Sequence, residues 1–274
     1  MMIYGSLFGV FDPCLSIAAA MTCRNPFISS FDNRDAADEA KKTFASDDHL
    51  AVLLAFQQWR ELNGRKSRAF LKENFLSYQS LSNIDRVRNQ LKRYMKDIGF
   101  VASSLEKDLI GSHELSLIRA VISAAMYPNV IVAPKKISTT AGEVPFRGQK
   151  GNVYLHPSTI AFSAKELDSR YCCYHEIMKT SKVFVRDCCA VSKFSLLLFG
   201  GTLKVYQSKG VVVLDEWLKF KCAAKPATLV KYLRQSMEAL LLEKIMDPSI
   251  DIAGSVKGRA VIDSVTYLLK VETK

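Results

Sequence analysis

Residues 171–189 read YCCYHEIMKTSKVFVRDCC, and this stretch decides the fold. Aromatic and β-branched residues dominate both of its ends, which is typical of two neighbouring strands. In the second of these strands, period-two alternation puts Lys182, Phe184 and Arg186 on one face and two valines on the other. The sequence therefore predicts a strand with a core side and a basic, aromatic side. That second side fits either a surface for single-stranded nucleic acid or an ordinary solvated strand face.

A similar residue composition continues on both sides of this stretch, from Pro128 to about Phe220. Short runs of Val, Ile, Tyr and Phe alternate with Gly, Pro, Ser and Lys, as in small antiparallel sheets. Short strands with helical sequence before and after them favour a barrel over a sandwich. The predicted strands are Val130–Ala133, Val144–Leu155, Tyr171–Met178 and Lys182–Cys189, followed by a helix over Ser192–Phe199 and two or three strands within Leu203–Phe220.

The flanking regions predict helices, because their apolar residues recur every three or four positions. Asp47-Asp48 supplies an N-cap and a first-turn acid for one helix, and Ser80 or Ser82 supplies the cap of the next. Two C-terminal helices follow over Ala227–Met246 and Arg259–Val271. The predicted fold class is α+β: an N-terminal helical bundle, a small antiparallel β-barrel and C-terminal helices. The expected buried face of the first C-terminal helix is Leu229, Leu233, Met237, Leu240 and Leu241.

Charge and composition narrow the function further. The chain has 274 residues and a net charge of +11, which favours a polyanionic partner such as nucleic acid. The excess is local: residues 60–96 carry ten basic and three acidic residues. Within them, Asn83–Lys96 is a basic helix whose outer face fits either a phosphate track or a solvated surface. Residues 1–23 are apolar but broken by Asp12-Pro13, which predicts a buried helix pair and no membrane partner.

The cysteines and histidines predict neither a metal site nor a catalytic centre. The seven cysteines show no disulfide framework or C-x-x-C spacing, so we expect reduced thiols and an intracellular protein, in the nucleus or the cytoplasm. Each of the pairs Cys172-Cys173 and Cys188-Cys189 is expected to send one thiol inward and one outward. A nucleophile at Cys173 beside His175 is a weaker hypothesis than a plain strand face. Gly148-Gln149-Lys150-Gly151 lacks the rest of a phosphate-binding loop, so no ATPase is predicted.

Several motifs taken together resemble the C-terminal region of DEAH-box and RHA-type RNA helicases. They occur in the order and at the spacing of that family, from the first residues to about Phe220. The matching stretches are Phe11–Ala19 (FDPCLSIAA) with Asn25-Pro26-Phe27, Ser46–Leu50 (SDDHL), Leu117–Val130, Tyr154–Ser158 (YLHPS), Tyr174-His175-Glu176, and Thr180-Ser181-Lys182 with Val185-Arg186-Asp187.

The resemblance implies a domain order and a role in RNA binding. It assigns residues 1–110 to a helicase-associated, ratchet-like helical domain, 115–221 to an OB-fold with its extension, and 222–274 to a C-terminal helical extension. In the family these domains wall the channel for single-stranded RNA, whereas ATP and Mg²⁺ belong to motor domains that the resemblance does not cover. We therefore expect no cofactor, no ATPase activity and no unwinding activity from this chain alone.

The expected RNA-binding residues come from three sources. The resemblance gives Lys182 and Arg186, the turn of His156, Pro157 and Ser158, and a channel-facing helix start at Ser46, Asp47 and His49. Strand alternation adds Phe184, and the basic helix adds Arg88 and Lys92. We expect phosphate-backbone contacts to single-stranded or structured RNA, with DNA as a second ligand.

The alternative function is a protein-interaction module that docks helicase motor domains or an activator protein. In that case Ile3, Leu7 and Phe8 in the opening segment would face solvent or a partner.

Overall fold

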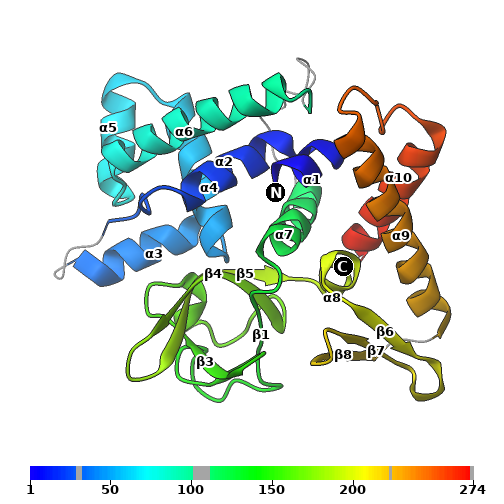
Figure 1. Ribbon diagram of the computed structural model, residues 1–274. Coiled ribbons are helices and arrows are strands. Elements are labelled where there is room, and N and C mark those ends of the chain that lie inside the picture. The colour runs from blue at the N-terminus through cyan, green and yellow to red at the C-terminus, as the bar shows by residue number, and fades with distance from the viewer. Residues whose placement is uncertain (29–32, 101–111, 222–223, 272–274) are drawn as a thin grey trace. The chain divides into compact units, whose positions relative to one another are not determined.

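The computed structural model describes residues 1–28, 33–100, 112–221 and 224–271 (Figure 1). It confirms the α+β class, with helices before and after a small closed barrel. The chain forms two compact units, each built from separated segments. We call Leu15–Arg93 with Asn129–Ala190 the barrel unit, and Met1–Cys14, Tyr94–Pro128 and Val191–Lys274 the C-terminal unit. The linear boundaries expected near residues 110 and 221 stay a prediction.

Five strands close the barrel in the order β1-β2-β3-β5-β4. They are β1 (Val130–Val132), β2 (Phe146–Gly148), β3 (Gly151–Leu155), β4 (Tyr171–Lys179) and β5 (Val183–Val191). The single strand expected over Val144–Leu155 is a hairpin, β2–β3, which turns beside Gly151 at a φ of +136°. β3 and β5 pair in parallel, so the barrel is not purely antiparallel.

A bulge in β5 corrects the expected alternation. Val183 and Val185 face the barrel core as predicted, but the next inward residue is Cys188 instead of residue 187. Asp187 adopts a positive φ of 52°, and a residue in this left-handed conformation inserts one extra position into a strand. The cysteine pairs alternate as expected, since only Cys172 and Cys188 belong to this barrel core, but no thiol reaches solvent: all four residues are at most 4% exposed. Burial raises the pKa of the Cys188 thiol well above its usual value, so it behaves as a core residue.

The helices of the barrel unit surround a second core. They are α2 (Phe11–Met21), α3 (Arg34–Phe44), α4 (Asp48–Glu61), α5 (Gly64–Glu73) and α6 (Tyr78–Asp97), and the unit boundaries fall inside α2 and α6. α4 and α6 contribute Phe56, Leu81 and Ile84, which are at most 1% exposed. The cap of α6 is Ser77, whose hydroxyl accepts the Ser80 N–H at 3.2 Å, so the expected caps Ser80 and Ser82 lie inside the helix.

Three consecutive residues at the start of α4 bond to the bulged part of β5. The Asp47 carboxylate accepts the Ala190 N–H at 2.7 Å, the Asp48 carboxylate accepts the Cys188 N–H at 2.9 Å, and His49 Nε2 donates to the Asp187 carbonyl at 3.0 Å. Asp47 does hold the N-cap position, but its side chain makes no capping bond. Asp47 and Asp48, which predict the start of the helix, therefore accept backbone N–H groups of the barrel instead of capping α4.

Asp48 is the most heavily bonded of the three residues. Its Oδ1 also accepts the Ile160 N–H at 3.0 Å and lies 2.5 Å from Lys41 Nζ on α3. Lys41 donates in turn to the Ser158 carbonyl at 3.1 Å. Both side chains of this ion pair are under 10% exposed. Loss of either side chain would leave the other as a buried charge without its counter-ion. This ion pair therefore fixes α3 and α4 against the barrel.

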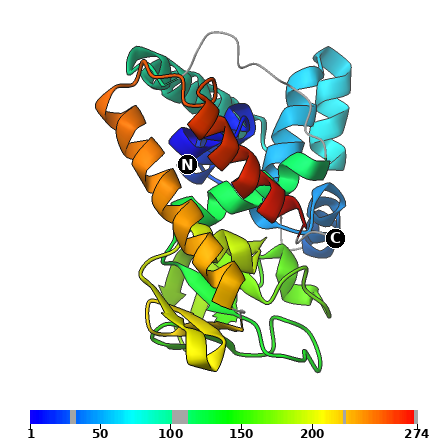
Figure 2. The same cartoon turned by 90° about the vertical axis from the view of Figure 1, so that its right-hand side faces the viewer.

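The C-terminal unit combines helices with a separate three-stranded sheet. Its sheet is the antiparallel meander β6 (Leu203–Tyr206), β7 (Val211–Leu214) and β8 (Leu218–Lys221). The helices are α1 (Met2–Leu7), α7 (Ser112–Met126), α8 (Lys193–Phe199), α9 (Ala224–Met246) and α10 (Val256–Val271). α9 and α10 pack together, as Figure 2 shows. Within the described residues, no helix has the length and apolar character needed to cross a bilayer.

Two expectations about this unit hold only in part. On α9, Met237 and Leu240 are buried as expected, together with Ala227 and Val230, but Leu229 is 53% exposed. In the opening segment, Ile3 and Leu7 are partly buried, whereas Phe8 is 7% exposed and its ring meets that of Phe199 edge-on at 5.9 Å. Within its own unit the opening segment is therefore partly packed.

Replacing Asp48 by Ala should destabilise the barrel unit strongly. The change leaves the Lys41 ammonium and two backbone N–H groups buried without their acceptor, which costs about 3–5 kcal/mol. Urea unfolding followed by Trp59 fluorescence measures it in a Trp217→Phe background, because Trp59 then is the only tryptophan. Asp38→Ala is the control, since Asp38 is exposed and pairs weakly with Arg34. A loss no larger than the control's would contradict this role of Asp48.

Acidification should weaken the same unit through His49. Burial, the largest influence, lowers the pKa of His49 from its usual 6.5; the neighbouring His175 also lowers it, and Asp187 and Asp48 act in the opposite direction. The unfolded chain therefore takes up this proton first, so stability is full above pH 6.5 and falls as the pH drops towards the folded pKa.

Unfolding in urea between pH 7.5 and 5.5 tests this dependence. His49→Gln keeps a donor for the Asp187 carbonyl and should flatten the curve. Some slope should remain, because burial and then Arg186 also lower the pKa of His156. A variant curve as steep as that of the wild type would exclude His49 as the source.

Candidate nucleic-acid interface

An array of rings and cations lies on the outer side of β3 and β5. Their parallel register places Tyr154 opposite Phe184, with the ring centroids 6.3 Å apart. Lys182 Nζ lies 4.3 Å from the centre of the Tyr154 ring, within cation–π range. The His156 ring meets Phe184 edge-on at 6.1 Å. We call Tyr154, His156, Lys182, Phe184 and Arg186 the β3–β5 array.

The turn that follows β3 is fixed by its own side chains. His156 Nδ1 accepts the Ser158 N–H at 3.1 Å, and the Ser158 hydroxyl lies 2.8 Å from the same nitrogen. Arg186 Nε reaches this hydroxyl at 3.4 Å, and its Nη1 lies 3.8 Å from Glu176. Burial, and then the nearby Arg186 guanidinium, lower the pKa of His156, so its ring is neutral at pH 7. Arg186 is thus held by its neighbours yet remains partly exposed.

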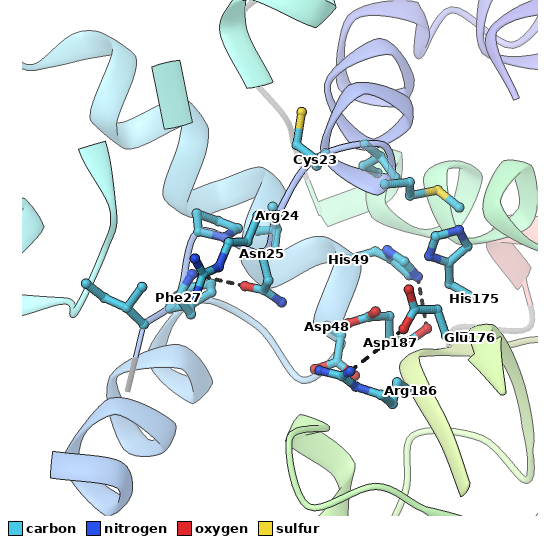
Figure 3. A pocket seen from close by; sticks show the side chains of 16 residues that line it. Cys23, Arg24, Asn25, Phe27, Asp48, His49, His175, Glu176, Arg186 and Asp187 are labelled. Carbon is cyan, nitrogen blue, oxygen red and sulfur yellow. Dashed lines mark hydrogen bonds and ion pairs between the residues drawn. The ribbon is translucent and has the colours of Figure 1, made fainter. Parts of the chain in front are cut away.

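A cavity of about 490 Å³ adjoins the array through Arg186. Figure 3 shows its walls: His175, Glu176, Arg186 and Asp187 come from the barrel, Asp48 and His49 from α4, and Cys23, Arg24, Asn25 and Phe27 from the segment after α2. The rings of His49 and His175 meet edge-on at 6.4 Å. Arg24 and Arg186 give the cavity two cations beside the carboxylates of Asp48, Glu176 and Asp187, and Arg24 and Asn25 are exposed.

The structure brings five of the expected RNA-binding residues together: Lys182, Phe184, Arg186, His156 and Ser158. Pro157 lies beside them but lines a second cavity, of about 560 Å³, that opens towards α3. Ser46 donates to Asp168 at 2.7 Å in a third cavity, away from the array. Lys92 lies half-buried on α6.

Three expected residues are buried and have structural partners. Asp47, His49 and Arg88 are 3%, 7% and 3% exposed, respectively. Arg88 Nε donates to the Ser16 hydroxyl at 3.0 Å. These placements argue against direct contact with RNA, except that His49 forms part of the cavity wall.

Sequence reasoning missed Tyr154, Arg24 and Asn25 as members of the interface. Tyr154 alternates with the core residues Val153 and Leu155, but only the parallel β3–β5 register, which no local pattern encodes, places it beside Lys182. The Arg24-Asn25 pair follows directly after a buried helix, and its charge was the available signal. Among the described residues, no cluster of His, Cys, Asp and Glu could hold a metal ion.

Comparison with protein-family models identifies three domains. Residues 1–74 match the ratchet-like helicase-associated domain (HA2), 118–203 match the oligonucleotide/oligosaccharide-binding (OB) fold, and 210–270 match the C-terminal domain of RNA helicases. The barrel described above lies within the second match. All three models therefore agree with the helical, barrel and C-terminal parts of the chain.

Curated relatives match along almost the whole chain. The DExH-box ATP-dependent RNA helicase DExH1 of Arabidopsis thaliana is 34% identical over 276 residues, 98% of this chain and 27% of the relative. The human putative ATP-dependent RNA helicase DHX57 is 34% identical over 99% of this chain and 23% of its own length. The human ATP-dependent DNA/RNA helicase DHX36 is 32% identical over all of this chain and 29% of its own. The chain thus spans less than a third of each of these relatives.

The three domain matches and these alignments together give both the family and the part of it that is present. This chain corresponds to the C-terminal, accessory region of DExH-type RNA helicases, with a ratchet-like helicase-associated domain, an OB-fold and a C-terminal domain.

Proposed function

We propose that this chain binds single-stranded RNA along the β3–β5 array and the adjoining cavity, and guides the strand as a non-catalytic part of a helicase. The observation that carries the proposal is the position of Lys182 and Arg186 on either side of Phe184, with Tyr154 opposite. ATP and Mg²⁺ would be bound by motor domains of the same helicase. DNA single strands would occupy the same surface.

The chemistry of the array fits a strand of nucleotides. Cations neutralise phosphates, while exposed ring faces stack on bases whatever their identity, at about 1–3 kcal/mol per base. Phe184 is only partly buried, so its ring is accessible to a base, while Lys182 covers one face of Tyr154 and places its charge beside the rings. Such a surface binds with little base selectivity, because it reads backbone charge and ring area instead of base edges.

The cysteines support a proposal about the compartment. The six cysteines within the described residues form no disulfide, although Cys172 and Cys188 share the barrel core. We propose an intracellular protein, in the nucleus or the cytoplasm, where thiols stay reduced.

Affinity for single-stranded RNA should fall as salt rises, and Lys182→Ala with Arg186→Ala should make that dependence shallower. Each phosphate neutralised on a single strand contributes about 0.7 to the slope of log affinity against log salt, so the pair should remove about 1.4. Fluorescence anisotropy with a labelled oligouridylate measures it. Lys219→Ala with Lys221→Ala, on exposed positions of β8, is the matched control. Equal slopes for both variants would remove the β3–β5 array from the site.

Phe184→Leu separates stacking from charge in the same assay. The loss of the ring should weaken binding about fivefold or more while the salt slope stays unchanged. Unaltered affinity would show that the array contacts phosphates alone.

A second candidate function is docking of helicase motor domains, and one observation favours it. α9 exposes five large apolar side chains, each more than half accessible: Leu229, Tyr232, Leu242, Ile245 and Met246. At about 100° per residue, Tyr232, Leu242 and Met246 lie within about 80° of one another on the helix, and we call these three the α9 row. Exposed apolar clusters of this kind mark interaction sites.

Isothermal titration with the motor domains of the Arabidopsis relative tests docking. Leu242→Ser with Met246→Ser should abolish the heat of binding, while Ile177→Ser, at a 56% exposed position on β4, should leave it intact. Binding that survives the double change would exclude the α9 row. Binding of an activator protein to this row, without binding of the motor domains, would contradict docking of the motor domains.

A further inference from the structure

We propose that the outer faces of α5 and α6 form a second nucleic-acid surface that docks the phosphate backbone of a duplex, separate from the single-strand site. Six cations define this surface, which we call the α5–α6 face: Arg65, Lys66, Arg68, Lys72, Arg86 and Arg93. Both helices turn their apolar sides to one core, through Phe70 and Leu71 on α5 and Ile84 on α6. The six cations lie on the opposite, solvent-exposed sides of the two helices, whose positions Figure 1 shows.

The cations of this face make no ion pair or side-chain hydrogen bond with another described residue, and all six are exposed. The basic residues nearby that do have partners are Arg60, which pairs with Asp85 at 3.4 Å, and Arg88, which is buried on Ser16. The other acids in residues 60–96 are Glu61 and Glu73, of which Glu73 ends α5, so the six cations still leave the face with a positive charge.

The composition of the face favours a duplex over a single strand. Its uncharged outward residue on α5 is Ala69, and no exposed ring lies on that helix. Single-strand sites need rings on which bases stack, whereas a duplex hides its bases and offers phosphates. The four α5 cations span about 11 Å of helix axis, over which a duplex presents about six charges.

The same composition argues against a protein partner. Protein interfaces are centred on apolar and aromatic anchors that exclude water from a buried core. The exposed rings of α6, Tyr78 and Tyr94, lie at opposite ends of that helix, with charged and amide side chains between them. A face of cations around Ala69 suits phosphate oxygens instead.

The test replaces Arg65, Lys66, Arg68 and Lys72 together by Ala in the full chain. Ala keeps α5 helical, so the change removes charge with little effect on the fold, which a thermal melt checks. The probe is a blunt-ended, labelled RNA duplex without overhangs, followed by anisotropy over a range of salt. Duplex affinity at low salt should fall at least tenfold, and the salt slope should become shallower by about 3.

The matched control removes the same charge elsewhere: Lys209→Ala, Lys219→Ala, Lys221→Ala and Lys231→Ala, all at exposed positions of the C-terminal unit. It should change duplex binding less than twofold. Equal losses in both variants would show diffuse attraction and overturn the proposal. So would competition by polyglutamate as effective as that by unlabelled duplex at equal charge, which would indicate an acidic protein ligand.

The experiments can contradict the proposed duplex surface and the proposed single-strand site separately. The α5 variant should bind oligouridylate with nearly wild-type affinity, and the variant at Lys182 and Arg186 should bind the blunt duplex nearly normally. A variant at Lys182 and Arg186 that lost duplex binding, with the α5 variant unaffected, would place both ligands on the barrel.

Discussion

The barrel unit depends on one buried carboxylate. Asp48 accepts hydrogen bonds from the Cys188 and Ile160 N–H groups and from the Lys41 ammonium, and almost none of it is exposed. These donors come from a strand, a short helical turn and helix α3, three parts of the chain that share no regular hydrogen-bond pattern. An ionised acceptor makes each of these bonds stronger than a neutral one would, which offsets the cost of burying the charge.

The bulge in β5 explains why the start of α4 binds there. An extra residue at Asp187 interrupts the strand's regular pairing, and buried backbone groups need partners. Asp47, Asp48 and His49 supply those partners at Ala190, Cys188 and Asp187. The bulge also ends the regular alternation just after Arg186, the last residue of the basic, aromatic side. The same irregularity thus anchors the helices and places Arg186 between the β3–β5 array and the cavity.

The sequence predicted whatever depends on short spacing and on motif order. Alternation placed Lys182, Phe184 and Arg186 on one side of a strand, and the family motifs gave the order of helices, barrel and C-terminal domain. It could not predict pairings between distant segments. The parallel β3–β5 register brings Tyr154 to Lys182, and the fold buries Arg88 against Ser16 although its neighbours on the basic helix are exposed. Asp47 and Asp48 have the local signature of a cap, and only the barrel's backbone gives them other partners.

The net charge of the chain does not distinguish two basic surfaces that differ in chemistry. The β3–β5 array has few cations, each held beside a ring or a hydroxyl, so it can order a flexible strand base by base. The α5–α6 face has more cations, none tied to another described side chain, and no ring on α5. Mobile lysine and arginine side chains adapt to regularly spaced phosphates without fixing a base, which suits a rigid duplex better than a flexible strand. Because the two surfaces share no residue, a single strand on the β3–β5 array and a duplex on the α5–α6 face would not compete, as the two proposals require.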